Sequence, residues 1–273
     1  MLLKALRVGG LLLVLYVVYG AALFVLQDKM LFPGTSLPVP PQLSRIADAK
    51  LIELPFDGGK SVAFYLPPVS VAPPVKTGAL IIAHGNGEIA DYLVDAFSGW
   101  RSMGVALLIV EYPGYGRAYG KPSDESIRKT MVAAFDWLAA HPEIDSKRIA
   151  AHGISLGGGA VGLLMRERPL AGAILHATFT SLRAFPPQYG LPSFLLRNEM
   201  NTLQTVEQTK IPVLVIHGKH DVIVAPEHGI ALAKAAKMAD FALWDCGHGC
   251  FQDDGKPLFA ATKAFLQRVG VAP

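Results

Sequence analysis

A serine in a glycine-rich stretch is the best candidate for chemistry in this chain. Ser155 is the centre of residues 153–157, which have the pattern G-x-S-x-G. This pattern typically places a nucleophilic serine on a strained turn between a strand and a helix. The apolar run 148–154 before it and the helix-compatible run after it fit that context. Flanking glycines suit so tight a turn because they carry no Cβ. We therefore expect Ser155 to attack a carbonyl carbon.

Two later loops contain an acid and a base for this serine. A serine hydroxyl becomes a strong nucleophile when a histidine takes its proton and a carboxylate orients that histidine. Asp221 follows the apolar run 213–217, and His248 lies between two glycines after the last predicted strand, 241–245. Both therefore lie beyond the carboxyl ends of predicted strands, where open α/β sheets bind ligands. We predict that Asp221 is the acid and His248 is the base.

Other acids and histidines compete for these roles. Asp245 is the main alternative acid, and Asp253 and Asp254 are weaker ones. Asp221 could instead only cap its loop, but its position after the penultimate strand favours the acid. The histidines nearest to it in the sequence are His217, His220 and His228. His248 is preferred because it is flanked by glycines in the last loop between a strand and a helix. We expect another histidine, His152, to pack beside the serine turn.

The oxyanion that forms during acyl transfer needs two N–H donors. Leu156 follows the nucleophile, so its backbone N–H should be one of them. Residues 84–87 have the sequence His-Gly-Asn-Gly and come directly after the predicted strand 79–83. We expect the backbone of Asn86 to be the second donor, with Gly87 as the alternative. An ordinary glycine-rich turn is the competing interpretation of this loop.

A second glycine-rich loop follows another predicted strand. Residues 112–116 have the sequence Tyr-Pro-Gly-Tyr-Gly. We expect Tyr112 and Tyr115 to help shape the substrate site, together with Gly85 and Gly87 from the first loop. A purely structural turn is the alternative for 112–116.

Together these motifs resemble the α/β-hydrolase superfamily. Within it, the chain is similar to the membrane-anchored bud-emergence homologues and α/β-hydrolase-domain proteins, a group that includes protein depalmitoylases. The resemblance covers about residues 50–270, and the order Ser155, Asp221, His248 is the order of this superfamily. It implies a serine hydrolase that acts on esters or thioesters without a metal or an organic cofactor, but it implies no particular substrate. The motifs that carry it are 84–87, 112–117, 153–158, 217–221 and 247–249.

Cys246 and Cys250 flank His248 and depart from the pattern that the resemblance leads us to expect. We predict unpaired thiols. A bridge that stiffens the histidine loop is the alternative in an oxidising compartment.

The residues before the domain form an apolar helix and a proline-rich connection. Residues 8–26 are nineteen consecutive uncharged residues, preceded by Lys4 and Arg7, and this length can span a bilayer. We expect an uncleaved signal anchor within residues 1–29; a cleaved signal peptide and a buried core helix are the alternatives. The positive charges place the N-terminus in the cytoplasm and the domain on the other side, although Lys29 reduces the asymmetry.

The rest of the chain has the pattern of one α/β domain. Residues 30–49 contain several prolines and should form an extended tether. From residue 50 to 273, a predicted hairpin (51–56 and 61–66) is followed by strand-like runs that alternate with helical stretches. This alternation predicts a mostly parallel central sheet with helices on both faces, as in the α/β-hydrolase fold. The proline- and aromatic-rich residues 181–210 interrupt the alternation and should form a short lid.

Composition narrows the range of partners. The formal net charge is only +3, and the sequence contains no run of lysines and arginines, which argues against nucleic-acid binding. The membrane helix and the apolar lid favour an acyl chain or another lipophilic small-molecule ester as the substrate. A serine peptidase with the same triad and a non-catalytic, membrane-tethered binding protein are the alternatives.

Overall fold

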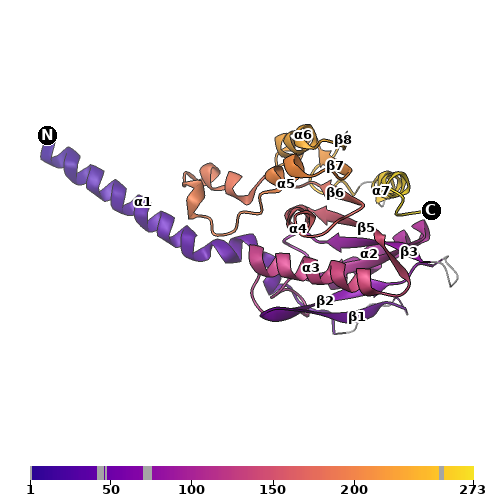
Figure 1. The fold of residues 1–273 in the computed structure, drawn as a ribbon. Coiled ribbons are helices and arrows are strands. Elements are labelled where there is room, and N and C mark those ends of the chain that lie inside the picture. Colours follow the sequence, from indigo (N-terminus) through magenta and orange to yellow (C-terminus); the bar gives the residue numbers. More distant parts are fainter. Residues whose placement is uncertain (1, 42–45, 47, 70–75, 252–254) are drawn as a thin grey trace.

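The computed structural model describes residues 2–41, 46, 48–69, 76–251 and 255–273. One long helix, α1 (Leu2–Leu31), projects from an α/β domain that contains the sheet (Figure 1). In the described part of the chain, α1 is the one helix that is long and apolar enough to cross a membrane. Parts of the predicted tether (42–45 and 47) lie outside the described residues.

The centre of the domain is an eight-stranded sheet with the order β1-β2-β4-β3-β5-β6-β7-β8. β1 and β2 form the predicted antiparallel hairpin, β2 is antiparallel to β4, and all later neighbours are parallel. The prediction of a mostly parallel sheet is therefore confirmed. The strands are β1 (Lys50–Phe56), β2 (Gly59–Leu66), β3 (Thr77–Ala83), β4 (Val105–Val110), β5 (Ile144–Ile154), β6 (Gly172–His176), β7 (Val213–Gly218) and β8 (Ala239–Trp244).

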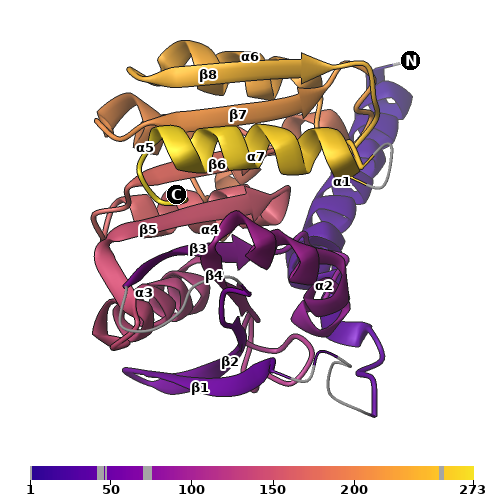
Figure 2. The same cartoon turned by 90° about the vertical axis from the view of Figure 1, so that its right-hand side faces the viewer.

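Helices cover both faces of this sheet, as predicted (Figure 2). Alternate residues of the parallel strands point to opposite faces. In β3, for example, Ile81 packs in one core and Leu80 in the other. β4 is therefore apolar along its whole length, as expected for a strand buried on both faces. One face carries α3 (Asp124–Ala140), α4 (Leu156–Met165), α5 (Thr202–Gln208) and α6 (Pro226–Ala235); the other carries α2 (Ala90–Phe97), the 3₁₀ helix η2 (Ser98–Met103) and α7 (Lys256–Arg268).

Residues 181–210 form an excursion between β6 and β7. Three short 3₁₀ helices, η3 (Leu182–Ala184), η4 (Pro186–Tyr189) and η5 (Ser193–Leu195), precede α5. Proline at the start of η4 suits a short helix of this kind, because its fixed φ favours the first turn. This excursion lies alongside the C-terminal half of α1 (Figure 1).

The connection after α1 packs on the domain, whereas the sequence predicted an extended tether. Phe32 is buried, and the residues after it form a 3₁₀ turn, η1 (Pro33–Ser36). Two side chains of the domain then hold the chain: Tyr92 donates to the carbonyl of Pro38 (2.7 Å) and Arg117 to that of Pro40 (2.7 Å). These contacts fix the C-terminal end of α1 relative to the sheet.

Candidate active site

Ser155 occupies the sharp turn between β5 and α4. Its backbone has φ 53° and ψ −113°, a strained conformation for a residue with a Cβ. The glycines of the motif are needed for close approach: a Cβ on Gly153 would collide with the carbonyl of Gly157, and a Cβ on Gly157 would collide with that of Ala83. The turn therefore holds Ser155 at the carboxyl edge of the sheet.

Asp221 and His248 meet in the loops after β7 and β8. The Nδ1 of His248 donates to Oδ2 of Asp221 at 2.7 Å. The other carboxylate oxygen accepts the backbone N–H groups of Ile223 and Val224, both at 2.9 Å, and the carboxyl group is fully buried. The acid is thus fixed, and its bond to Nδ1 leaves Nε2 as the nitrogen that can exchange a proton.

The competing acid lies elsewhere. Asp245 contacts Nε2 of His220 at 2.7 Å, and both side chains are exposed. Asp253 and Asp254 lie outside the described residues. The structure therefore pairs Asp221, and not Asp245, with His248.

Ser155 shares the carboxyl edge of the sheet with Asp221 and His248, because parallel strands end on the same side. Within the described residues, no hydrogen bond joins Ser155 to His248. Such a bond often tightens only when substrate binds.

Two backbone N–H groups that lie near Ser155 have no hydrogen-bond acceptor among the residues that the structure describes. Leu156 is the first residue of α4, so its N–H has no acceptor within the helix. The N–H of Asn86 donates to no acceptor in the described part of the chain, whereas that of Gly85 is bound by Glu88 (2.8 Å). Asn86 and Leu156 line the same cavity as Ser155. Gly87 is exposed.

Tyr112 and Tyr115 do not line this cavity. Both side chains are buried, and their hydroxyls donate to the carbonyls of His84 (2.8 Å) and Asn86 (3.2 Å). They support the 84–87 loop, so their effect on the shape of the site passes through that loop and not through the cavity lining.

A buried ion pair that the sequence analysis missed also supports this loop. His84 Nε2 contacts Glu111 at 2.8 Å, and neither side chain is exposed. Burial acts to lower the pKa of His84, but the charge and hydrogen bond of Glu111 outweigh it and raise the pKa. Glu111 also accepts the N–H of Ala90 (3.0 Å). A single acid directly after the apolar run of β4 is the signal that could have revealed it.

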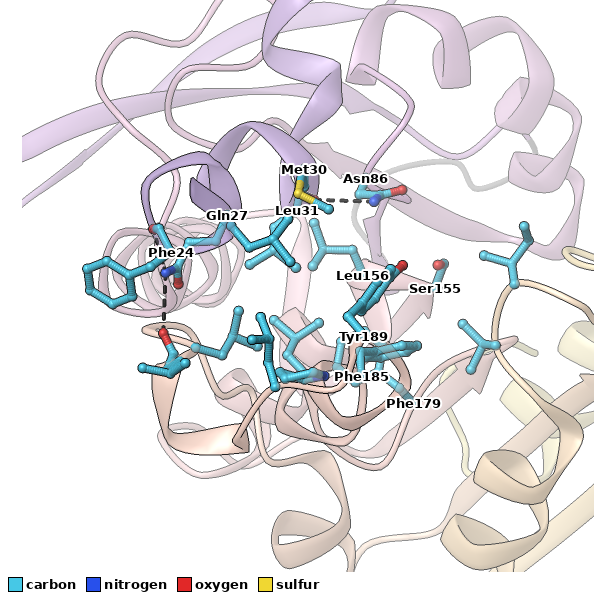
Figure 3. A pocket seen from close by; sticks show the side chains of 18 residues that line it. Phe24, Gln27, Met30, Leu31, Asn86, Ser155, Leu156, Phe179, Phe185 and Tyr189 are labelled. Carbon is cyan, nitrogen blue, oxygen red and sulfur yellow. Dashed lines mark hydrogen bonds between the residues drawn. The ribbon is translucent and has the colours of Figure 1, made fainter. Parts of the chain in front are cut away.

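An apolar cavity of about 290 Å³ leads away from Ser155. Figure 3 shows Ser155, Leu156 and Asn86 at one end and Phe24 and Gln27 of α1 at the other. The 181–210 segment forms the facing wall. The cavity suits an apolar group attached to the carbonyl that Ser155 would attack.

Cys246 and Cys250 form a disulfide that encloses His248 in a five-residue loop. This finding corrects the expectation of free thiols. The two Cα atoms are 5.4 Å apart, within the usual range for a bridge. A sequence separation of four residues says little about whether a turn brings two cysteines together.

Comparisons with known proteins concern the family and the fold of the chain. The model of the prolyl oligopeptidase family matches residues 97–244. An uncharacterized protein of Mycobacterium tuberculosis is 29% identical over 253 residues, covering 90% of this chain and 89% of that protein. An α/β-hydrolase domain-containing protein of Arabidopsis thaliana is 30% identical over 247 residues, which cover 81% of this chain and 79% of that protein. A solved esterase from Thermogutta terrifontis superposes with a TM-score of 0.68 at 18% identity, covering 84% of this chain and 95% of its own.

Proposed function

Because the chain belongs to the prolyl oligopeptidase family of α/β-hydrolases, we propose that it is a serine hydrolase that cleaves carboxylic esters or thioesters through Ser155, His248 and Asp221. The observation that carries the proposal is the strained Ser155 at the end of an apolar cavity, on the sheet edge that holds the Asp221–His248 pair. A strained backbone at such a position is a feature of nucleophile turns.

Acylation is the first step. Nε2 of His248 takes the proton of Ser155 as the serine oxygen attacks the acyl carbon. The buried carboxylate of Asp221 stabilises the imidazolium that forms. The N–H groups of Leu156 and Asn86 bind the oxyanion. Collapse of the intermediate breaks the ester or thioester bond, and the alcohol or thiol leaves with the proton from His248.

Deacylation repeats these roles with water. His248 deprotonates a water molecule that attacks the acyl-serine, and the same two N–H groups bind the second oxyanion. The carboxylic acid leaves and Ser155 recovers its proton. Every proton in the cycle passes through His248, so no cofactor is needed.

The proposed setting is a membrane, with α1 as a single-pass signal anchor and a lipophilic acyl compound as the substrate. Lys4 and Arg7 precede the apolar stretch, which favours a cytoplasmic N-terminus. The domain would then face a non-cytoplasmic compartment, where the disulfide beside His248 would persist. In that arrangement the 181–210 segment is a lid over the cavity.

Labelling with a fluorophosphonate probe tests the nucleophile. The purified full chain should be labelled, and the Ser155→Ala variant should not. Esters of p-nitrophenol with increasing acyl length should then be hydrolysed by the wild type alone. Equal labelling of the variant would refute the role of Ser155. A folded wild type that is never labelled would favour a non-catalytic binding protein.

A serine peptidase is the second candidate, and the family description favours it. The same triad can cleave an amide, because His248 can protonate an amine leaving group. Hydrolysis of peptide p-nitroanilides at a rate above that of the matching esters would support this alternative.

A further inference from the structure

Helix α1 forms part of the cavity that contains Ser155, in addition to any role as an anchor. It contributes one wall of the cavity (Figure 3). Its C-terminal end is tied to the candidate oxyanion loop, because Asn86 Nδ2 donates to the carbonyl of Leu31 at 3.2 Å. The lining residues from α1 are Leu23, Phe24, Gln27, Met30 and Leu31.

The facing wall is a long uncharged loop, residues 184–196, between Arg183 and Arg197. Phe194 and Tyr189 in this loop are 76% and 53% exposed. An uncharged loop with exposed aromatic side chains and an arginine at each end has the composition of a segment that enters a bilayer from one side.

Polar contacts hold this loop along α1. Tyr16 donates to the carbonyl of Gly190 (2.8 Å), and Tyr19 to that of Tyr189 (3.1 Å). Gln27 accepts the N–H of Arg197 at 2.8 Å. The loop can lie in hydrocarbon only if its backbone groups find partners within the protein, and these tyrosine hydroxyls supply two of them.

The positions of these contacts give the depth of the loop. The apolar stretch of α1 ends at Leu26, and the contact at Tyr16 lies ten residues before it. At 1.5 Å per residue, this distance is about 15 Å, half of a hydrocarbon core of about 30 Å. If α1 spans a bilayer, the tip of the loop therefore reaches its middle, and the cavity between α1 and the loop lies at the membrane surface.

We propose that α1 and the 184–196 loop together form an acyl-chain site that takes its substrate sideways from the bilayer. The substrate class is a long-chain acyl ester or thioester whose chain lies between α1 and the loop while its carbonyl reaches Ser155. This inference rests on the proposed hydrolase function and adds the origin of the substrate and a binding role for the anchor helix.

The test compares two tryptophan variants of the full chain in phosphatidylcholine vesicles. Leu23→Trp places a large ring in the cavity wall. Val25→Trp, its matched control, changes a residue of the same helix that is 73% exposed and does not line the cavity. The substrates are the butanoyl and hexadecanoyl esters of 4-methylumbelliferone. The readout is the ratio of kcat/KM for the long ester to that for the short one.

In the wild type, the ratio should favour the long ester, because only the hexadecanoyl chain is long enough to fill the cavity. Leu23→Trp should lower the ratio at least tenfold, and Val25→Trp should leave it unchanged. If the Leu23→Trp variant kept the same ratio of kcat/KM values as the wild type, the proposal would be overturned. If Ser155-dependent hydrolysis of the butanoyl ester persists in that case, the hydrolase function stands without the acyl site.

A second measurement tests the depth of the loop without relying on activity. Phe194→Trp should show additional fluorescence that lipids brominated in the acyl chain quench. The three native tryptophans, Trp100, Trp137 and Trp244, lie in the α/β domain and supply the background. Quenching no greater than in the wild type would place the loop outside the hydrocarbon and overturn the entry route.

Discussion

Replacing Ser155 by glycine should stabilise the protein while abolishing its activity. The backbone of Ser155 has φ 53° and ψ −113°, a conformation that a residue with a Cβ adopts at a cost of about 1–3 kcal/mol. Glycine avoids that strain. Its greater freedom in the unfolded state costs about 0.5–1 kcal/mol relative to alanine. The difference predicts that Ser155→Gly is more stable than Ser155→Ala by about 1 kcal/mol.

The comparison with Ser155→Ala isolates the backbone strain. Both variants lack the hydroxyl, so they lose catalysis and side-chain hydrogen bonding equally. For a domain of this size, about 1 kcal/mol raises Tm by roughly 2–4 °C. The assay is thermal unfolding of the full chain in detergent micelles, followed by circular dichroism.

An ordinary backbone position provides the control. Ala225 is exposed and has φ −54°, so Ala225→Gly should lower Tm. If Ser155→Gly were no more stable than Ser155→Ala, the strain at the turn would be absent, and the argument for a nucleophile turn would lose its main physical support.

Three further predictions concern the acid, a buried histidine and the support of the 84–87 loop. Asp221→Asn should lower kcat for a p-nitrophenyl ester by about 10⁴, whereas Asp245→Asn, on the surface, should change it less than twofold. Burial lowers the pKa of His176 to about 3. Between pH 6.5 and 3 the unfolded state therefore binds more protons than the native state. The free energy of unfolding then decreases as the pH is lowered, by up to about 1.4 kcal/mol per pH unit. His176→Phe should reduce that slope in urea titrations at several pH values; an unchanged slope would contradict the shift. Glu111→Gln should destabilise the chain by about 3 kcal/mol, because it breaks a buried pair with His84; urea unfolding measures this, and a change below 1 kcal/mol would contradict it.

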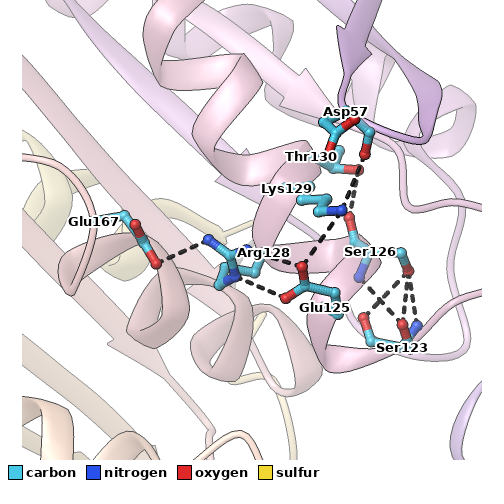
Figure 4. Close-up of polar contacts among 8 residues, drawn as sticks. All are labelled: Asp57, Ser123, Glu125, Ser126, Arg128, Lys129, Thr130 and Glu167. Carbon is cyan, nitrogen blue, oxygen red and sulfur yellow. Dashed lines mark hydrogen bonds and ion pairs between the residues drawn. The ribbon is translucent and has the colours of Figure 1, made fainter.

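The predicted alternation of strands and helices depends on local signals. In α3, which spans Asp124–Ala140, the contacts of the first turns join residues that are close in the sequence. Ser123 caps it by accepting the N–H of Ser126 (3.1 Å), and Arg128 pairs with Glu125 three residues before it (Figure 4). These contacts join neighbours in the sequence, so the pattern of residue types reveals them.

The sequence could also predict which loops meet at the carboxyl edge of the sheet, but it could not predict the directions of their side chains. Asp221 and His248 were expected near Ser155 because parallel strands bring their carboxyl ends together. Tyr112 and Tyr115 belong to a loop at the same edge, yet their rings turn into the core and support His84 and Asn86, respectively. Which way a loop side chain turns depends on what packs around it, and a sequence pattern does not contain that information.

The contact between α1 and the 184–196 loop is stabilised by other interactions than the core of the domain. If both lie in a bilayer, packing them together gains little from the hydrophobic effect, because lipid chains are as apolar as the side chains they replace. The pairing must then depend on polar contacts, and Tyr16, Tyr19 and Gln27 supply them. A helix that served only as an anchor would need no such side chains along the loop. Their positions on one side of α1 therefore favour a helix that holds the loop, and with it the cavity, in a fixed place beside Ser155.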